Sequence, residues 1–198
     1  MAVNDKFFQP PLWKDTRLAA GGFSASGAKT GGIVNPVVVE LPAGSSVFRF
    51  FHDPTREIGE WWVTPYELSV IVAYFGRSDL GTGRSSGKGI FHATLAVRHD
   101  WAKNSPLHLG RFVVARLAGS LKACHGEGDH APDASYSTVQ KAAYIIDHTG
   151  RQRKARQIFL PQAWTYKTAL PVVDQGMSDM DLAGALGRVS SARLPFET

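Results

Sequence analysis

Short apolar segments, rich in valine, isoleucine and aromatic residues and interrupted by glycine, proline or aspartate, dominate the chain from residue 46 onward. This punctuation is typical of a domain built mainly from strands. In residues 90–98 apolar and more polar positions alternate, which favours a half-buried antiparallel strand. Strands are predicted at Val47–Phe51, Ile90–Arg98, Arg111–Leu117, Arg156–Leu160 and Thr165–Val173, and a shorter one within Ile33–Leu41.

Helices are predicted where a capping residue opens a run. The best start signal is Thr64-Pro65-Tyr66-Glu67, in which a threonine cap, a proline at the first helical position and a glutamate at the third form a capping box. This helix would end near Phe75, although the β-branched run Val70–Val72 also fits a buried strand. Ser137–Asp147 and Ser178–Val189 are the other predicted helices, and each begins at a serine.

The chain divides into two parts by composition. Residues 1–45 contain Pro10-Pro11, Gly21-Gly22 and further glycines that interrupt any long helix or strand, so an irregular arm is expected there. Residues 46–198 are expected to form one α+β domain with a catalytic character. A chain of 198 residues suits a single unit that buries roughly 70% of its unfolded surface.

Composition excludes several classes of protein. Apolar residues make up 43% and charged residues 20% of the chain, which is ordinary globular usage, and no stretch approaches the 18 apolar residues of a membrane span. A lone cysteine, Cys124, excludes an internal disulfide framework and suits a reducing compartment. We therefore expect a protein that stays in the cytoplasm, or that a specialised export system delivers into a target cell, with no membrane partner.

The net charge of +5 favours an anionic partner, such as a nucleotide or nucleic acid. The densest basic cluster is Arg151–Arg156, which fits a solvated loop or a phosphate contact. An alternative function follows from it: a basic nucleic-acid-binding protein or ribonuclease, with His52, His92 and His99 as acid or base groups. These histidines have no recognisable spacing.

Two loops carry residues of chemical interest. Gly76–Gly89 is rich in glycine, but Gly83-x-x-x-Gly87-Lys88 is one residue short of a P-loop, which favours a flexible loop. Cys124–His130 gathers five potential zinc ligands, yet no second ligand pair follows it, so a polar loop is the simpler interpretation. No metal is expected.

Arg49 is the clearest candidate for a functional residue. It lies in the apolar strand Val47–Phe51, where a charged side chain requires a partner or a ligand. A guanidinium can bind a pyrophosphate through two parallel hydrogen bonds, which lysine cannot do. A structural carboxylate, Glu57, Glu60 or Glu67, is the alternative partner.

Three segments, Val47–Arg49, Gly59–Pro65 and Gln157–Pro161, together resemble the ADP-ribosyltransferase superfamily, and within it the NAD glycohydrolases of the necrotizing-toxin type. In that superfamily an arginine on the first core strand holds NAD, and a glycine-x-aromatic-x-Ser/Thr-Pro segment helps to hold the nicotinamide ribose. A late strand presents a catalytic glutamate or glutamine before an apolar run that often ends in Leu-Pro. The resemblance spans roughly residues 46–173 and implies an α+β fold with a split, mostly antiparallel sheet and a few flanking helices.

The resemblance assigns catalytic roles to Arg49, Gln157 and Thr64. Arg49 would anchor the pyrophosphate of NAD, the substrate, and Thr64 would support the ribose or Arg49. Cleavage of the nicotinamide–ribose bond builds positive charge on the ribose, so Gln157 would lower the barrier by orienting the ribose hydroxyls. Trp62 or Tyr66 would stack on nicotinamide, although Trp61-Trp62 also fits a packing pair. Arg156 would contact a phosphate.

The chain departs from the transferase pattern beside Gln157. Typical transferases place a glutamate at this position and Glu or Gln two residues earlier, where this chain has Ala155, and no acidic residue occurs between Asp147 and Asp174. The resemblance therefore implies an NAD glycohydrolase, or a mono-ADP-ribosyltransferase with a macromolecular acceptor. A toxin or effector of this kind would have a neutralising partner. A non-enzymatic structural or interaction module is the remaining alternative.

Overall fold

The computed structural model describes residues 1–23, 32–51, 55, 57–75, 111–129, 131–132, 139–140, 144–177 and 179–197. Helices in these ranges are α1 (Leu12–Ala20), α2 (Pro65–Phe75), α4 (Asp179–Arg188) and the 3₁₀ helices η1 (Asp5–Phe8) and η5 (Ala163–Ala169). The strands are β1 (Val37–Leu41), β2 (Ser46–Phe51), β3 (Trp61–Trp62), β4 (Arg111–Arg116), β5 (Leu121–Glu127), β6 (Ala131–Pro132), β7 (Val139–Gln140), β8 (Tyr144–Ile146), β9 (Gln152–Lys154), β10 (Arg156–Phe159) and β11 (Val172–Gly176).

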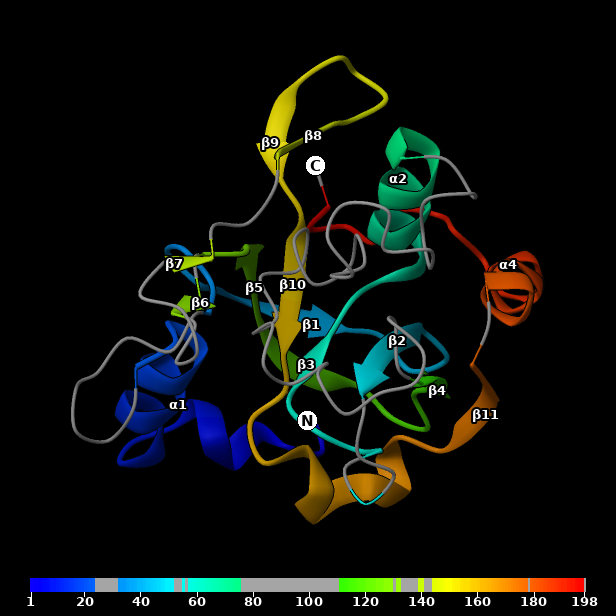
Figure 1. Ribbon diagram of the computed structural model, residues 1–198. Coiled ribbons are helices and arrows are strands. Elements are labelled where there is room, and N and C mark those ends of the chain that lie inside the picture. The colour runs from blue at the N-terminus through cyan, green and yellow to red at the C-terminus, as the bar shows by residue number, and fades with distance from the viewer. Residues whose placement is uncertain are drawn as a thin grey trace.

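Two antiparallel sheets form the centre of the molecule. One sheet has the strand order β1-β5-β10-β3 and the other has the order β11-β4-β2. Within the described residues, a bridge between Phe48 and Val63 joins the two sheets through a pair of 2.8 Å backbone hydrogen bonds. Figure 1 shows β10 in the middle of the arrangement, between β5 and β3. The fold is α+β with mostly antiparallel sheets and a few helices, as the sequence patterns predict.

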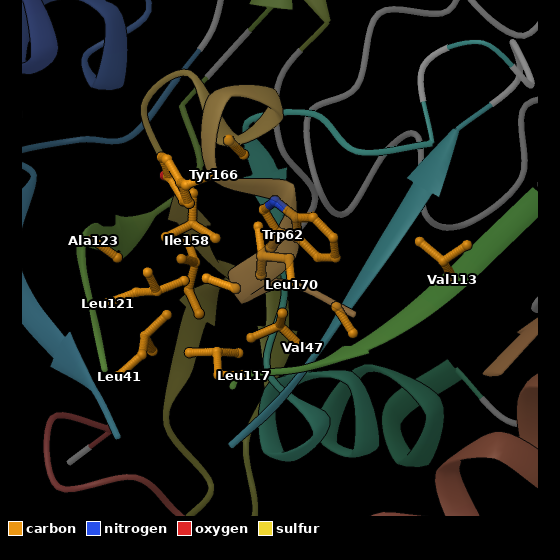
Figure 2. Packing of buried hydrophobic residues seen from close by; sticks show 14 of the residues in the cluster. Leu41, Val47, Trp62, Val113, Leu117, Leu121, Ala123, Ile158, Tyr166 and Leu170 are labelled. Atoms are coloured by element: carbon orange, nitrogen blue, oxygen red, sulfur yellow. The ribbon is translucent and has the colours of Figure 1, made fainter. Parts of the chain in front are cut away.

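Both sheets contribute to one apolar cluster. Val47 and Val113 reach it from the three-stranded sheet, and Trp62 and Ile158 reach it from the four-stranded sheet. Figure 2 shows Val47, Trp62 and Ile158 grouped near Leu170, which follows η5, with Val113 to one side. Burial of an apolar side chain of this size contributes roughly 1.5–3 kcal/mol, so this cluster fixes the relative position of the two sheets.

The opposite face of β2 and β4 has a second apolar cluster. Phe48 and Val114 follow Val47 and Val113 along their strands and therefore point to the other side of the sheet. There they pack against Leu68 and Ile71 of α2 and Leu182 of α4. The helix α2 is thereby attached to the strand that carries Arg49.

Most of the predicted strands are confirmed. β2, β4 and β10 match the predicted segments within a residue at each end, and β1 occupies the second half of Ile33–Leu41. The predicted helices at 65–75 and 178–189 are confirmed as α2 and α4. The strand predicted at Ile90–Arg98 and the glycine-rich loop Gly76–Gly89 lie outside the described residues, as do His52, His92 and His99.

Two predicted elements are wrong. η5 takes the first part of Thr165–Val173, and the strand β11 begins only at Val172. Where Ser137–Asp147 is described, it forms β7 and β8 instead of a helix. The Asp147 carboxylate explains this, because it accepts the backbone N–H groups of Thr149 and Arg151 at 2.9 and 3.1 Å and builds the turn that joins β8 to β9.

The first 20 residues differ from the irregular arm expected there. They form η1 and α1, and Phe7 lies in the apolar core. The Asn4 side chain binds both backbone groups of Lys122, at 2.7 and 2.8 Å, which attaches this segment to β5. Pro11 stands at the start of α1, where a proline does not interrupt a helix. Among the described helices, none has the length and apolar character needed to cross a membrane.

Candidate functional site

The three segments that carry the sequence motifs lie side by side. β2 meets the residue that follows β3 through the Phe48–Val63 bridge, and β3 pairs with β10 through Trp62–Ile158 and Trp61–Phe159. Strand β10 is about a hundred positions further along the chain than β3. The fold therefore places the glycine-aromatic segment between the arginine strand and the glutamine strand.

Arg49 lies where the two sheets separate. Beyond the Phe48–Val63 bridge, the Arg49 guanidinium reaches the next strand and donates from Nη1 to the Trp61 carbonyl at 3.1 Å. A Cβ atom at Gly59 would overlap this guanidinium, so glycine is the residue that permits the close approach. Burial raises the pKa of the nearby Glu60 carboxyl, and the positive charge of Arg49 acts in the opposite direction.

Thr64 caps helix α2, as the capping-box pattern predicts. Its Oγ1 accepts the backbone N–H of Glu67 at 3.1 Å. The Glu67 side chain, however, binds a different strand and so departs from the reciprocal capping bond. Its carboxylate receives Arg153 Nη1 and Nη2 at 2.6 and 2.8 Å and the backbone N–H of Arg156 at 2.9 Å.

The basic cluster Arg151–Arg156 is therefore not the solvated loop predicted from its charge. Arg153 on β9 is buried and forms a bidentate ion pair with Glu67, and its Nε also contacts Asp147 Oδ2 at 3.2 Å. Lys154 lies 4.0 Å from Asp129. Strand geometry separates these cations, because successive side chains of a strand point to opposite faces.

Glu197, near the C-terminus, is the main site residue that sequence reasoning missed. It is only 1% exposed, and its carboxyl group accepts the Thr64 hydroxyl and, at 2.8 Å, the backbone N–H of Leu194. Burial raises the pKa of Glu197 above its usual value. No local pattern indicates this role, because the contact joins positions 133 residues apart.

His125 contacts the C-terminal segment at Phe196, the residue before Glu197. It is buried on β5, and the Phe196 ring packs against it edge-on with 4.8 Å between centroids. Burial, together with the positive charges of Arg156 and Arg153, lowers the pKa of His125 to about 4. We call Thr64, Glu67, His125, Arg153, Arg156 and Glu197 the polar centre.

The segment Cys124–His130 is not a polar loop where it is described, because residues 124–127 belong to β5. The alternation of the strand places Cys124 beside Phe159 and His125 beside Phe196, on opposite faces. Burial raises the pKa of the Cys124 thiol to about 12. In the described ranges, no group of three His, Cys, Asp or Glu side chains is arranged to hold a metal.

Gln157 lies on the face of β10 opposite to Arg156 and Ile158. It is 6% exposed, and Gly128 packs against its carboxamide so closely that a Cβ there would lie 2.5 Å from Nε2. Arg49 is the register partner of Val113 in β2 and β4, so it lies on the face of these strands that carries the shared apolar cluster. The fold brings the strands of Arg49 and Gln157 together without bringing the two side chains onto one face.

The two aromatic candidates have different surroundings. Trp62 is 2% exposed, and its indole N–H donates to the Gly59 carbonyl at 2.6 Å within the apolar cluster, which are the surroundings of a packing residue. Tyr66 lines a cavity of about 530 Å³. Its hydroxyl lies 2.9 Å from His148 Nδ1, and the Arg193 guanidinium stacks 4.9 Å from its ring centroid.

The predicted site residues thus occupy separate places. Thr64 and Arg156 meet in the polar centre, Arg49 lies where the sheets separate, and Gln157 and Tyr66 lie elsewhere. Comparison with models of protein families finds no match, and comparison with curated protein sequences also finds none.

Proposed function

We propose that this chain is an NAD-consuming enzyme that cleaves the nicotinamide–ribose bond. One observation carries the proposal: three motif segments that are separated in the sequence lie side by side, with Gly59–Pro65 between the Arg49 strand and the Gln157 strand. Residue type alone defines these motifs, and the sequence does not require such segments to be neighbours. Their adjacency therefore supports a shared functional site.

The place where β2 and β3 separate is the proposed anchor for the NAD pyrophosphate. Arg49 is half-buried there, held by the Trp61 carbonyl and packed on Gly59. A guanidinium fixed in this way keeps its planar fork in one orientation, which suits two parallel hydrogen bonds to a phosphate group. Reduced freedom before binding also lowers the entropic cost of holding the ligand.

Hydrolysis is the proposed reaction, ahead of transfer to a protein or nucleic acid. The strand of Gln157 has Ala155 two positions earlier, so it offers an amide and no carboxylate. An amide can orient ribose hydroxyls as positive charge develops on the sugar, which stabilises the transition state more than the substrate. A carboxylate that activates an acceptor would have to come from elsewhere, and Glu197 is the buried one nearest to Thr64.

The test is release of free nicotinamide from NAD, with and without candidate protein and nucleic-acid acceptors. We expect release by the wild-type chain and its loss in both Arg49→Ala and Gln157→Ala. Because the two side chains lie on different faces, the two variants report on the two faces separately. Loss in Arg49→Ala alone would restrict the site to the Arg49 face, and full activity of both variants would refute the proposal.

A further inference from the structure

The two large sheets have free edges at β1 and β11. As far as the described strands extend, β1 is bonded only to β5, and β11 is bonded only to β4. The other two ends, β3 and β2, meet each other through the Phe48–Val63 bridge. An edge strand exposes backbone N–H and C=O groups that can pair with another chain, and natural proteins protect such edges with bulges, charges or covering segments.

The β11 edge is protected, whereas the β1 edge is not. The register of β11 shifts at a bulge between Val172 and Asp174, and Asp174 forms an ion pair with Arg188 of α4. Strand β1 pairs with β5 in unbroken register and begins with three valines, of which Val37 and Val38 are 55% and 46% exposed. A regular, exposed, valine-rich edge is a template for strand pairing, so β1 is where a second chain can extend the sheet.

The beginning of β1 lies beside two cations. Pro36, the residue before the strand, lines a cavity of about 600 Å³ together with Lys14 and Arg17 of α1. Both cations are exposed, and neither forms an ion pair within the part of the chain that the structure describes. Asp129 also lines this cavity, but it lies 4.0 Å from Lys154, which balances its charge. The cavity end of β1 is therefore positive.

The far end of β1 carries a negative charge on the same face of the sheet. Burial raises the pKa of Cys124 and the positive charge of Arg17 acts against this, so Arg17 lies near Cys124, the register partner of Val38. Glu40 is exposed and lies two positions after Val38, so its side chain points to this face too. Its own register partner, Lys122, is already bound to an aspartate of η1. One face of β1 thus has a positive beginning and a negative end.

We propose that two copies of this chain pair through their β1 strands, antiparallel and centred on Val38, and so form one continuous sheet. In this arrangement the two Val38 residues lie opposite each other, and Val37 of each copy lies opposite Val39 of the other. Pairs of β-branched residues across a strand pair stabilise a sheet. The strand is only five residues long, so we expect a weak dimer whose population depends on concentration.

Charge complementarity makes a second copy the occupant that fits this edge. Antiparallel pairing places Glu40 of each copy opposite Pro36 of the other, and opposed residues point to the same face. Each Glu40 therefore reaches the cavity end that holds Lys14 and Arg17. A two-fold interface is self-complementary, so both ends are matched at once. An unrelated extended peptide would have to supply this carboxylate itself.

The experiment is sedimentation of the full chain over a series of concentrations, which measures the dissociation constant of the dimer. Val38→Lys places two lysines opposite each other at the centre of the pair, and it should weaken the dimer at least about tenfold because like charges directly opposite are destabilising. Val173→Lys is the matched control. It makes the same change at a valine that is 55% exposed on the protected β11 edge, and it should leave the dissociation constant unchanged.

Charge exchange tests the antiparallel arrangement. Glu40→Lys alone should weaken the dimer, and so should Lys14→Glu combined with Arg17→Glu. The chain with all three changes again has opposite charges at each end, so it should recover much of the wild-type affinity. These three side chains are exposed, so the series also gives an answer if Val38→Lys does not fold.

Three results would overturn the inference. A wild-type chain that sediments as a monomer even at about 1 mM, where pairing contributes no more than ~4 kcal/mol, would leave the edge to a different partner. Equal weakening by Val38→Lys and Val173→Lys would show that β1 is not the interface, and failure of the triple charge exchange to restore affinity would exclude the antiparallel pairing. None of these results bears on NAD cleavage, because β1 contains none of the proposed site residues.

Discussion

Loss of Arg153 should destabilise the protein strongly, because it leaves the Glu67 carboxylate buried without its cation. The two side chains are 2% and 1% exposed, and they are joined by hydrogen bonds of 2.6 and 2.8 Å. Removal of one partner of a buried pair costs about 3–5 kcal/mol. For a chain of this length that corresponds to a fall in Tm of roughly 6–20 °C. Arg153→Met keeps much of the volume of the side chain and tests this.

The assay is urea unfolding followed by tryptophan fluorescence, since the chain has five tryptophans. The matched control is Arg188→Ala, which removes an ion pair with Asp174 that is 62% exposed on the arginine side. Exposed pairs contribute about 0–1 kcal/mol, so this variant should remain close to the wild type. The double variant Glu67→Met with Arg153→Met removes both charges and should cost less than the sum of the single changes.

A free energy of unfolding of Arg153→Met within about 1 kcal/mol of the wild-type value, at an unchanged m-value, would contradict this prediction. Additive losses in the double variant would also contradict it, because they would show that the two charges do not depend on each other. A confirmed loss of stability would also bear on the position of strand β10. Glu67 also holds the backbone N–H of Arg156, so the ion pair fixes the start of β10.

Three further predictions address individual residues. Gly59→Ala places a Cβ on the Arg49 guanidinium and should lower nicotinamide release by roughly 100-fold, the effect of a misplacement of about 1 Å; Gly187→Ala, with open space around its Cβ, should leave the release unchanged. His125 binds a proton near pH 6.5 when unfolded but near 4 when folded. The free energy of unfolding should therefore fall by up to about 3 kcal/mol from pH 7 to pH 4, and His125→Leu should remove that part of the slope in urea titrations; equal slopes would contradict the assignment. Cys124, with a pKa of about 12, should react with a thiol reagent at pH 8 only on unfolding, and rapid reaction of the native protein would count against its burial.

Local chemistry made much of the fold predictable. The apolar runs of β2, β4 and β10 and the capped start of α2 are signals contained within a few residues, and the structure confirms them. β5 was missed because its residues Gly126 and His125 belong to a polar-looking sequence, whereas the strand is stabilised by its two neighbours, β1 and β10. Sheet pairing overrides propensity in such a segment.

The candidate site was less predictable, for reasons of distance and orientation. The alternation of β10 follows from the sequence, but which of its faces meets Arg49 depends on the pairing of other strands. The ion pair of Arg153 with Glu67 and the bond of Thr64 with Glu197 join residues 86 and 133 positions apart. A charge run such as Arg151–Arg156 reveals neither partner, so it resembles a solvated surface.

The most direct test of the account is free nicotinamide released from NAD by the wild-type chain beside Arg49→Lys, a change that keeps the positive charge and removes the planar fork. We predict steady release by the wild type and its near absence in a folded Arg49→Lys protein, because an ammonium group cannot reproduce two parallel hydrogen bonds to a phosphate. No release by the folded wild-type protein, or equal release by the variant, would contradict the central claim that Arg49 holds NAD between β2 and β3.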